Sequence, residues 1–473
     1  MIDYLVILAY FAAMVAAGWY GMRKARNADD FLVAGRRLGY SFYAGTLAAV
    51  VLGGASTIGG VRLGYLYGIS GMWLVLMLGL GIVVLSLVFS RRLTSLGVYT
   101  VSEMLGNRFG APPRVVGGLV MAAYDLMVSV TATLAMGTVF DVLLGIPRVP
   151  AIIIGGGLVV AYSALGGMWS ITLTDLLQFA IMTVGIFGLL LPISVHRAGG
   201  WDGLHDRLPD SYFSVGSIGA GTIVTYFLIY FFGIIIGQDV WQRVFTARNH
   251  RVARIAGLGA GVYCMAYGVA GALIGLAAKA LLPNLAVPDN AFAAVAKEVL
   301  PVGVTGLVLA AALAAVMSTA SACTLAASTI LANDVVGRGG GMRTQRAYIL
   351  AVGAAVILIS CLVQDVVAGL TIAYNLLVGG LLVPIVGALF WPRSTSRGAI
   401  AAICAGSLVV IVLMATQGLL ANGPIYWGLL TSAVAFVAVS LATRPDEPHR
   451  VAATATNRPR VLRDDLLDLD RRP

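Results

Sequence analysis

Two apolar stretches of the chain contain small and hydroxyl-bearing residues that could bind a cation. Residues 53–60 read Gly-Gly-Ala-Ser-Thr-Ile-Gly-Gly, and residues 315–321 read Ala-Val-Met-Ser-Thr-Ala-Ser. A glycine-rich segment unwinds easily and frees carbonyl oxygens, and serine and threonine add neutral ligands that suit a cation which must also leave. The alternatives are close helix packing through small residues for the first stretch and hydroxyls bonded to their own helix for the second.

Two carboxylates inside apolar segments are a second kind of candidate. Asp125 lies about 16 Å beyond Arg114 along its segment, and Asp175 about 10 Å into its own. A charged residue at the centre of a bilayer costs roughly 2.5–3.5 kcal/mol on insertion scales, so such residues usually have a function. Asp125 could meet a cation, a proton or a solute amine, or it could bond a neighbouring helix. Asp175 could also extend toward the membrane interface.

The elements that position these residues are predicted to be membrane-spanning helices. Hydrophobic residues make up 59% of the 473-residue chain and charged residues only 11%, against about 25% charged in soluble domains. At about 20 apolar residues per crossing, thirteen spans are expected in an all-α polytopic membrane protein. They cover approximately residues 2–22, 40–62, 68–90, 115–144, 149–166, 169–195, 217–237, 252–282, 303–333, 346–363, 368–391, 398–417 and 424–443.

The distribution of basic residues predicts the orientation of these spans. With thirteen crossings, 25 of the 31 Lys and Arg residues fall on one face, including Arg243 in the loop after the seventh span. Because basic loops stay in the cytoplasm, we expect a multi-pass protein of the cell (inner) membrane with its N-terminus outside and its C-terminus cytoplasmic. The net charge of +10 therefore indicates contact with the lipid bilayer and not with nucleic acid.

The depth of the two hydroxyl-rich stretches predicts that they meet. Ala49 lies about 18 Å in from Arg37 and Ser318 about 24 Å in from Asp334, both from the cytoplasmic side. Two carbonyls of the second span, with a carbonyl and two hydroxyls of the ninth, could then supply the five oxygens that a dehydrated monovalent cation needs.

Glycines at 233 and 237 allow a second break, in the seventh span. Spans two to six and seven to eleven then enter from opposite sides and each open with an interrupted helix, as in two inverted five-helix repeats of a transporter. We expect an extra helix and loop at 1–37, a ten-helix core at 38–393 with repeats at about 38–196 and 215–393, two further spans at 394–443 and a disordered cytoplasmic tail at 444–473.

Five motifs in order resemble those of one known family. They are ADDFLVAGRRLG at 28–39, VSEMLGNRFG at 101–110, GGMWSITLTDLLQF at 166–179, GQDVWQRVFTAR at 237–248 and AALAAVMSTASACTLAASTILANDVV at 311–336. The chain resembles, from about Ala28 to Arg397, the sodium:solute symporter family, whose members carry proline, sugars, pantothenate and monocarboxylates. The resemblance implies the leucine-transporter fold.

The resemblance also implies a set of sodium ligands. The family pattern corresponds here to the carbonyls of Ala49, Leu52 and Ala315 and the hydroxyls of Ser318 and Thr319. It places Asp175 where family members have an acid on the cytoplasmic exit route of sodium. Val51 stands where some relatives have a polar residue, so that auxiliary contact is missing.

The solute is less defined by the resemblance. Ser56 and Gly233 stand where sugar carriers have a glutamine and a gating tyrosine, which argues against a sugar, and Ala55 stands where proline carriers have a tryptophan. The remaining candidates for contact with the solute are Ser56, Thr57, Asp125, Ser129, Tyr374 and Asn375.

These features predict sodium-coupled symport of a small organic solute, such as the amino acid proline or a monocarboxylate, by alternating access. A proton-coupled carrier using Asp125 and a non-concentrating channel or sensor are the alternatives. We expect no enzyme, because no span or loop presents a nucleophilic or metal-binding constellation. The four cysteines lie inside apolar runs and predict neither a disulfide framework nor a zinc site.

Overall fold

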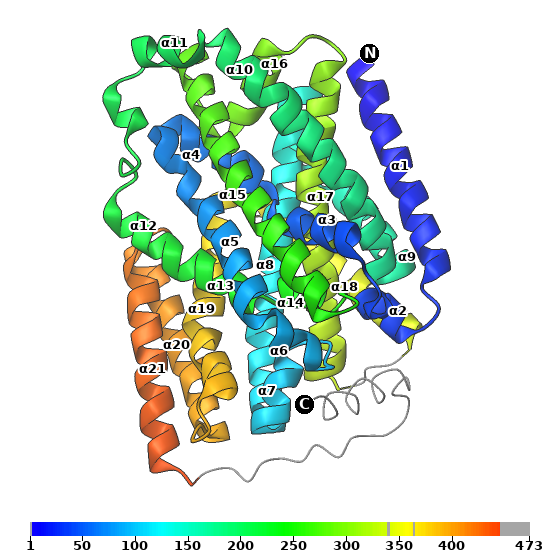
Figure 1. Ribbon diagram of the computed structural model, residues 1–473, viewed down its shortest axis with the longest axis vertical. Coiled ribbons are helices and arrows are strands. Elements are labelled where there is room, and N and C mark those ends of the chain that lie inside the picture. Colours follow the sequence, from blue (N-terminus) through cyan, green and yellow to red (C-terminus); the bar gives the residue numbers. More distant parts are fainter. Residues whose placement is uncertain (1, 338–340, 363–364, 445–473) are drawn as a thin grey trace, which may run out of the picture.

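The computed structural model describes residues 2–337, 341–362 and 365–444, and every regular element in these ranges is a helix (Figure 1). The α-helices are α1 (Ile2–Lys24), α2 (Ala28–Val33), α3 (Tyr40–Val51), α4 (Gly60–Tyr67), α5 (Trp73–Val84), α6 (Ser90–Ser95), α7 (Val101–Phe109), α8 (Ala111–Leu144), α9 (Arg148–Met182), α10 (Leu191–Arg197), α11 (Gly200–Arg207), α12 (Ala220–Tyr226), α13 (Phe232–Ile236), α14 (Gln238–Val244), α15 (His250–Leu281), α16 (Ala291–Val299), α17 (Val304–Ile330), α18 (Met342–Leu362), α19 (Val366–Phe390), α20 (Ser396–Gln417) and α21 (Gly423–Ala442). Short π-helical segments extend or join some of them, namely η2 (Ala55–Gly59), η4 (Leu85–Phe89), η5 (Thr183–Leu190), η7 (Phe227–Phe231) and η9 (Leu331–Val335). The predicted tail at 444–473 lies outside the described residues except for its first residue.

The described residues contain ten helical stretches long and apolar enough to cross a membrane, or eleven if one bent pair counts as a single span. Two of the ten, Ala55–Ser95 and Arg148–Arg197, are 41 and 50 residues long, about twice what one crossing needs. Backbone turns at Gly68 (φ 62°, ψ −139°) and Gly167 (φ 55°, ψ −134°) divide them. If the bent pair is counted as a span, both long stretches are divided at these glycines, and Tyr40–Val51 is joined to the helix after it, the total is thirteen crossings. This number stays a prediction.

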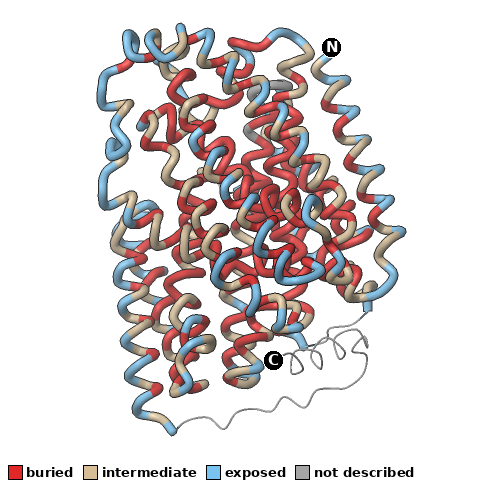
Figure 2. Tube along the Cα trace, in the orientation of Figure 1, coloured by how far each residue is buried: buried red, intermediate tan, exposed pale blue. Residues whose placement is uncertain are grey.

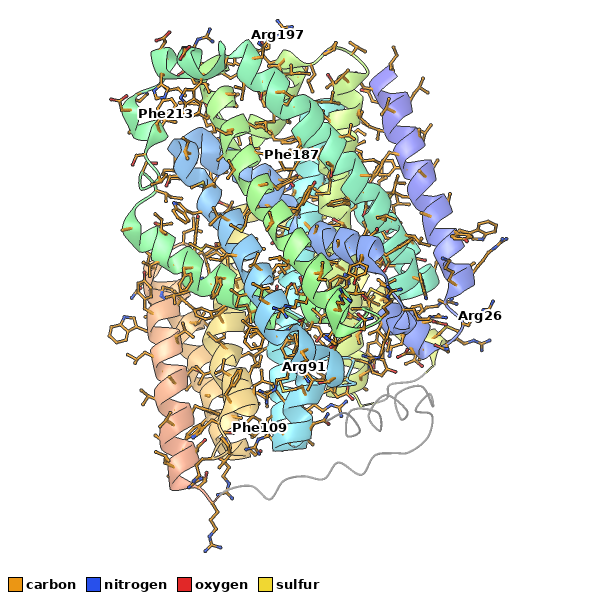
Figure 3. All side chains as sticks on the ribbon, viewed as in Figure 1. Arg26, Arg91, Phe109, Phe187, Arg197 and Phe213 are labelled. Atoms are coloured by element: carbon orange, nitrogen blue, oxygen red, sulfur yellow. The ribbon has the colours of Figure 1, made fainter. Side chains whose placement is uncertain are left out.

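The two ends of the described chain lie at opposite ends of the helical bundle. Figure 1 shows the N-terminus at the same end of the bundle as α10, α11 and α16, whereas α7 and the last turn of α21 lie at the other end. In Figure 3, Arg197 projects at the end of the N-terminus, and Arg26 and Arg91 lie in the opposite half. This arrangement agrees with an odd number of crossings.

The helix that starts at Tyr40 is broken where the glycines occur. Helix α3 ends at Val51, Leu52 has non-helical dihedral angles (φ −90°, ψ 58°), and helical structure resumes at η2. A Cβ atom on Gly54 would lie 2.5 Å from the Cβ of Ala135 on α8, closer than real Cβ contacts. The glycine therefore allows α8 to pack directly against the break.

A second break separates Ala220–Ile236 from α14, and the two parts are bent by 43°. Gly237 is extended here (φ −63°, ψ 134°), and every residue of α14 is buried. The sequence predicts Arg243 in a loop, but it lies in α14 with its side chain fully buried. The physical reason is a buried acidic partner, Asp175 on α9, described below.

Helix α17 occupies the centre of the bundle. In its most apolar 18-residue window, 94% of the residues are buried, and its neighbours include α1, α3, α8, α9 and α18. Figure 2 shows buried residues concentrated around this region, with exposed residues on the outer helices. Alanines and small hydroxyl residues fill most of α17, so neighbouring helices can approach on every side.

The end of the bundle that carries α7 is held by a buried carboxylate. Asp334 in η9 accepts a hydrogen bond from Ser102 Oγ (2.8 Å) and pairs with Arg114 (2.8 Å). These contacts join α7, α8 and the end of the central helix.

Candidate functional site

The break after α3 lies directly against the two hydroxyls of α17. Ser318 Oγ is 2.8 Å from the carbonyl oxygens of both Ala49 and Ala315, and Thr319 Oγ1 donates to the carbonyl of Val50 at 2.8 Å. Both side chains are buried. Oxygens from two helices that are distant in sequence therefore converge at one point.

The local structure explains why these carbonyls are available. The last four carbonyls of a helix have no amide partner within the helix, and α3 ends at Val51 inside the protein. Three consecutive carbonyls each accept a hydroxyl instead, because Ser56 Oγ donates to the carbonyl of Val51 at 2.8 Å. A hydroxyl can also offer lone pairs to a cation, so the same atoms can satisfy the helix end or bind an ion.

The structure thus brings together most of the oxygens that the sequence predicts as sodium ligands. Ser318 Oγ contacts the carbonyls of both Ala49 and Ala315, whereas Thr319 donates to the carbonyl of Val50, which is not one of the predicted ligands. Leu52 forms the break itself, and a Cβ atom built on the following Gly53 would lie 2.5 Å from Thr319 Oγ1.

Asp175 lies on α9, next to the same part of α3. Thr46 Oγ1, one turn before Ala49, donates to Asp175 Oδ2, and Arg243 Nη2 lies 3.5 Å from the same oxygen. The carboxylate and the guanidinium are both fully buried, so each needs the other as a counter-charge. Asp175 therefore does not extend toward the interface.

A small cavity adjoins these oxygens. Thr319 and the residues of the break form one wall, and α5, α8, α13, α14 and α19 form the others. Its lining residues are Val50, Val51, Gly53, Gly54, Ala55, Ser56, Leu78, Val128, Thr131, Ala132, Ile234, Asp239, Thr319, Leu370 and Tyr374. Mostly apolar walls with a few polar groups are typical of small-molecule sites.

Of the predicted solute contacts, Ser56 and Tyr374 line this cavity. Thr57, Ser129 and Asn375 are buried outside its lining. The hydroxyl of Thr57 is 2.8 Å from that of Tyr267, and Ser129 Oγ lies 2.9 Å from the hydroxyl of Thr324 on α17. Asn375 Nδ2 donates to its own helix, at the carbonyl of Thr371 (2.9 Å). The contacts of Thr57 and Ser129 therefore join neighbouring helices.

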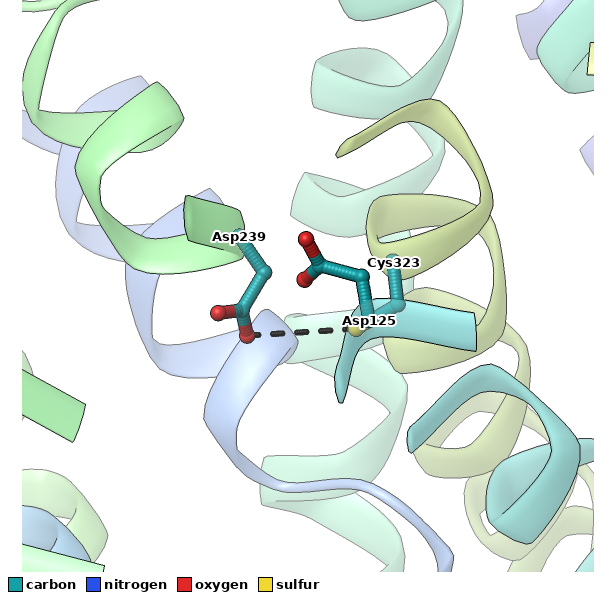
Figure 4. Close-up of side chains that lie close together, drawn as sticks. All are labelled: Asp125, Asp239 and Cys323. Carbon is teal, nitrogen blue, oxygen red and sulfur yellow. Dashed lines mark hydrogen bonds between the residues drawn. The ribbon is translucent and has the colours of Figure 1, made fainter. Parts of the chain in front are cut away.

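Asp125 lies on α8, outside the lining of the cavity. It is fully buried, neither carboxylate oxygen has a hydrogen-bond partner among the described residues, and the backbone amide of Asp239 faces it outside hydrogen-bond geometry. Ligand atoms of Asp125, Asp239 and Cys323 lie within 4.8 Å of one another (Figure 4).

The sequence reasoning missed Asp239 and Arg243 as part of this site. Asp239 and Arg243 are four residues apart and follow Gly237. That spacing puts both side chains on one face of a helix, and it could have indicated that they belong to the site.

Proteins of known function and structure are similar to the chain over most of its length. A sodium/proline symporter of Staphylococcus aureus (strain JH9) is 26% identical over 452 residues, which cover 87% of this chain and 86% of the relative.

Two solved structures share the fold. A Na+-coupled sialic acid symporter in a substrate-bound outward-open state has a TM-score of 0.83 at 19% identity, covering 94% of this chain and 98% of that one. MhsT in complex with L-phenylalanine has a TM-score of 0.57 at 13% identity, covering 85% and 99%. The predicted leucine-transporter fold is confirmed.

The family model described as "Sodium:solute symporter family" matches residues 31–406, close to the range of the motifs. With that match over most of the described core, the chain belongs to the sodium:solute symporter family.

Proposed function

We propose that this symporter moves a small organic solute together with sodium by alternating access, and that sodium binds at the break in the first core helix. The ligands are the carbonyls of Ala49, Leu52 and Ala315 and the hydroxyls of Ser318 and Thr319. One observation supports this assignment above the others: Ser318 Oγ lies 2.8 Å from carbonyls of both α3 and α17. An ion at this point would bridge the two helices, so its binding and release can bias their relative position.

The energy available from sodium is sufficient for accumulation. A tenfold sodium gradient supplies about 1.4 kcal/mol, and a membrane potential of about 100 mV adds about 2.3 kcal/mol per charge. Together, about 3.7 kcal/mol could concentrate a neutral solute roughly 500-fold.

We infer that the solute enters the cavity beside this site and contacts Ser56 and Tyr374, which line it. Candidates are an amino acid such as proline, which the Staphylococcus aureus relative is named for, or a monocarboxylate. In this proposal Thr57, Ser129 and Asn375 support the surrounding helices. Asp175, bonded to Thr46 one turn from Ala49, acts on the route by which sodium leaves.

The proposed orientation has the N-terminus outside the inner membrane and the C-terminus in the cytoplasm. It is supported by the excess of basic residues on one face. The core at 38–393 would then carry the transport site, with the helix and loop at 1–37 and the spans at 394–443 as additions outside the two repeats.

Uptake into proteoliposomes containing the purified chain tests this function. Labelled proline and labelled lactate are supplied with an inward sodium gradient, and with an equal potassium gradient as the control. We expect accumulation above the external concentration of at least one solute with sodium alone, and its loss when a sodium ionophore is added. Equal uptake in the two salts, or uptake that stops at the external concentration, would show that the carrier is not sodium-driven.

A proton-coupled carrier is the second candidate, because Asp125 is buried and has no hydrogen-bond partner among the described side chains and amides. It predicts that a proton gradient without sodium drives accumulation in the wild type and not in Asp125→Asn. Sodium-driven uptake that persists in Asp125→Asn counts against this candidate.

A further inference from the structure

We propose that the transported solute carries a positively charged amine, and that Asp239 binds this amine at the cavity wall against the ring of Tyr374. The inference rests on the proposed function, because it concerns the solute of the same cavity. It narrows the solute to amino acids and other small amines and excludes monocarboxylates.

The buried charges near the cavity are out of balance. Asp125, Asp175 and Asp239 are at most 2% exposed, and the guanidinium of Arg243 is the one buried cation among the described residues around them. Its ion pair is with Asp175, at 3.5 Å. Carboxylate oxygens of Asp125 and Asp239 lie within 4.8 Å of each other, so an additional positive charge would stabilise both.

Asp239 is the member of this cluster that a solute can reach. It lines the cavity, whereas Asp125 is not among the lining residues. Its side-chain contacts are long: Tyr124 OH donates to Oδ1 at 3.3 Å, and Cys323 Sγ donates to Oδ2 at 3.9 Å (Figure 4). An ionised carboxylate has about four lone-pair positions, so Asp239 keeps acceptor capacity for an ammonium group.

An aromatic ring lines the same cavity. Tyr374 lines the cavity, and its ring is held edge-to-face by Tyr124 and Tyr230, each with ring centroids 5.1 Å away. A side chain at Gly233 would collide with this ring, so the glycine lets the tyrosine pack against α13. A carboxylate and an aromatic ring that line one cavity can together recognise an organic ammonium ion.

The same surroundings are unsuited to a second sodium ion. The third ligand atom of the cluster is a sulfur, a soft donor that hard cations do not prefer. The cavity next to Asp239 is walled by apolar side chains, including Val128, Ile234 and Leu370, which suit the carbon atoms of an organic cation.

Binding of matched pairs of compounds to the purified full chain, at saturating sodium, tests the inference. Proline is compared with cyclopentanecarboxylate, and leucine with isocaproate; each pair differs in the amine. We expect an amine-bearing member to raise the unfolding temperature and its amine-free partner to leave it unchanged. An amine-free compound that binds as tightly as its partner overturns the inference, and so does binding of amine-free compounds alone.

Variants connect the selectivity to the residues. Asp239→Asn should weaken amine binding at least about 100-fold while the shift produced by sodium alone is retained, which also shows that the variant is folded. Asp206→Asn, an exposed acid on α11, is the matched control and should bind as the wild type does. Tyr374→Phe should keep amine binding, and Tyr374→Leu should weaken it about tenfold.

Two results would contradict this assignment. Amine binding unchanged in Asp239→Asn removes the proposed contact, and a raised sodium requirement with unchanged amine binding assigns the carboxylate to a second sodium ion. Both results come from binding measurements on the purified chain, so they do not depend on whether it transports the solute. Amine-selective binding without sodium-driven accumulation would instead refute the proposed function and leave the amine site in place.

Discussion

Replacing Ser318 with alanine tests the sodium site most directly. The change removes a fully buried hydroxyl that lies 2.8 Å from the carbonyls of Ala49 and Ala315, and it leaves no atom in its place that can contact a cation. A hydrogen bond or ligand contact to a charged group contributes about 1.5–3 kcal/mol. The sodium concentration for half-maximal uptake should therefore rise roughly 10- to 150-fold, and Thr319→Ala should act in the same direction.

The assay is the initial rate of solute uptake into proteoliposomes, measured over a series of sodium concentrations at fixed membrane potential. Ser328→Ala is the matched control, because Ser328 is on the same helix, is fully buried and bonds only the carbonyl of Leu325 in its own helix (2.8 Å) among the described contacts. It should retain the wild-type sodium dependence. Wild-type sodium dependence in both Ser318→Ala and Thr319→Ala would refute the assigned site.

Three further predictions follow from other contacts. Gly53→Ala should abolish accumulation at normal expression, since the new Cβ would lie 2.5 Å from a threonine hydroxyl of α17; a fully active variant would contradict the close approach. Asp175→Asn should lower stability by about 3–5 kcal/mol, seen as a lower unfolding temperature, because it leaves Arg243 buried without a counter-charge; an unchanged temperature would show that the pair is not stabilising. Arg114→Ala should speed hydrogen exchange in α7 by removing the 2.8 Å ion pair to Asp334, and unchanged protection would argue against that role.

Much of the fold is predictable from the sequence because the bilayer imposes a simple rule. Each crossing needs about 20 apolar residues, and glycines mark where a crossing can unwind, as at Gly53 and Gly54. The rule failed at α14. Asp239 and Arg243 give that segment the composition of a solvated loop. The burial of Arg243 depends on its ion pair with Asp175, which lies 68 residues away in the sequence, and a hydropathy profile contains no information about such a pair.

The candidate site was also predictable only in part. The rise of 1.5 Å per residue gives the depth of Ala49 and Ser318, and this was enough to predict that they meet. The cavity walls could not be predicted by depth. Thr131 lines the cavity and Ser129, two residues away at nearly the same depth, does not, because the rotation of α8 about its axis decides which side chain points inward.

The close packing of α17 has a consequence for how such a carrier could change its solute during evolution. An added methyl group on a buried face of this helix would displace a neighbour, so half of the proposed sodium site lies on a helix with little tolerance for substitution. Helices α8 and α19 also face the cavity, and both have residues on the outer surface of the bundle, such as Leu119 and Val386. New specificities should therefore arise by substitutions on those two walls, with the coupling to sodium inherited unchanged.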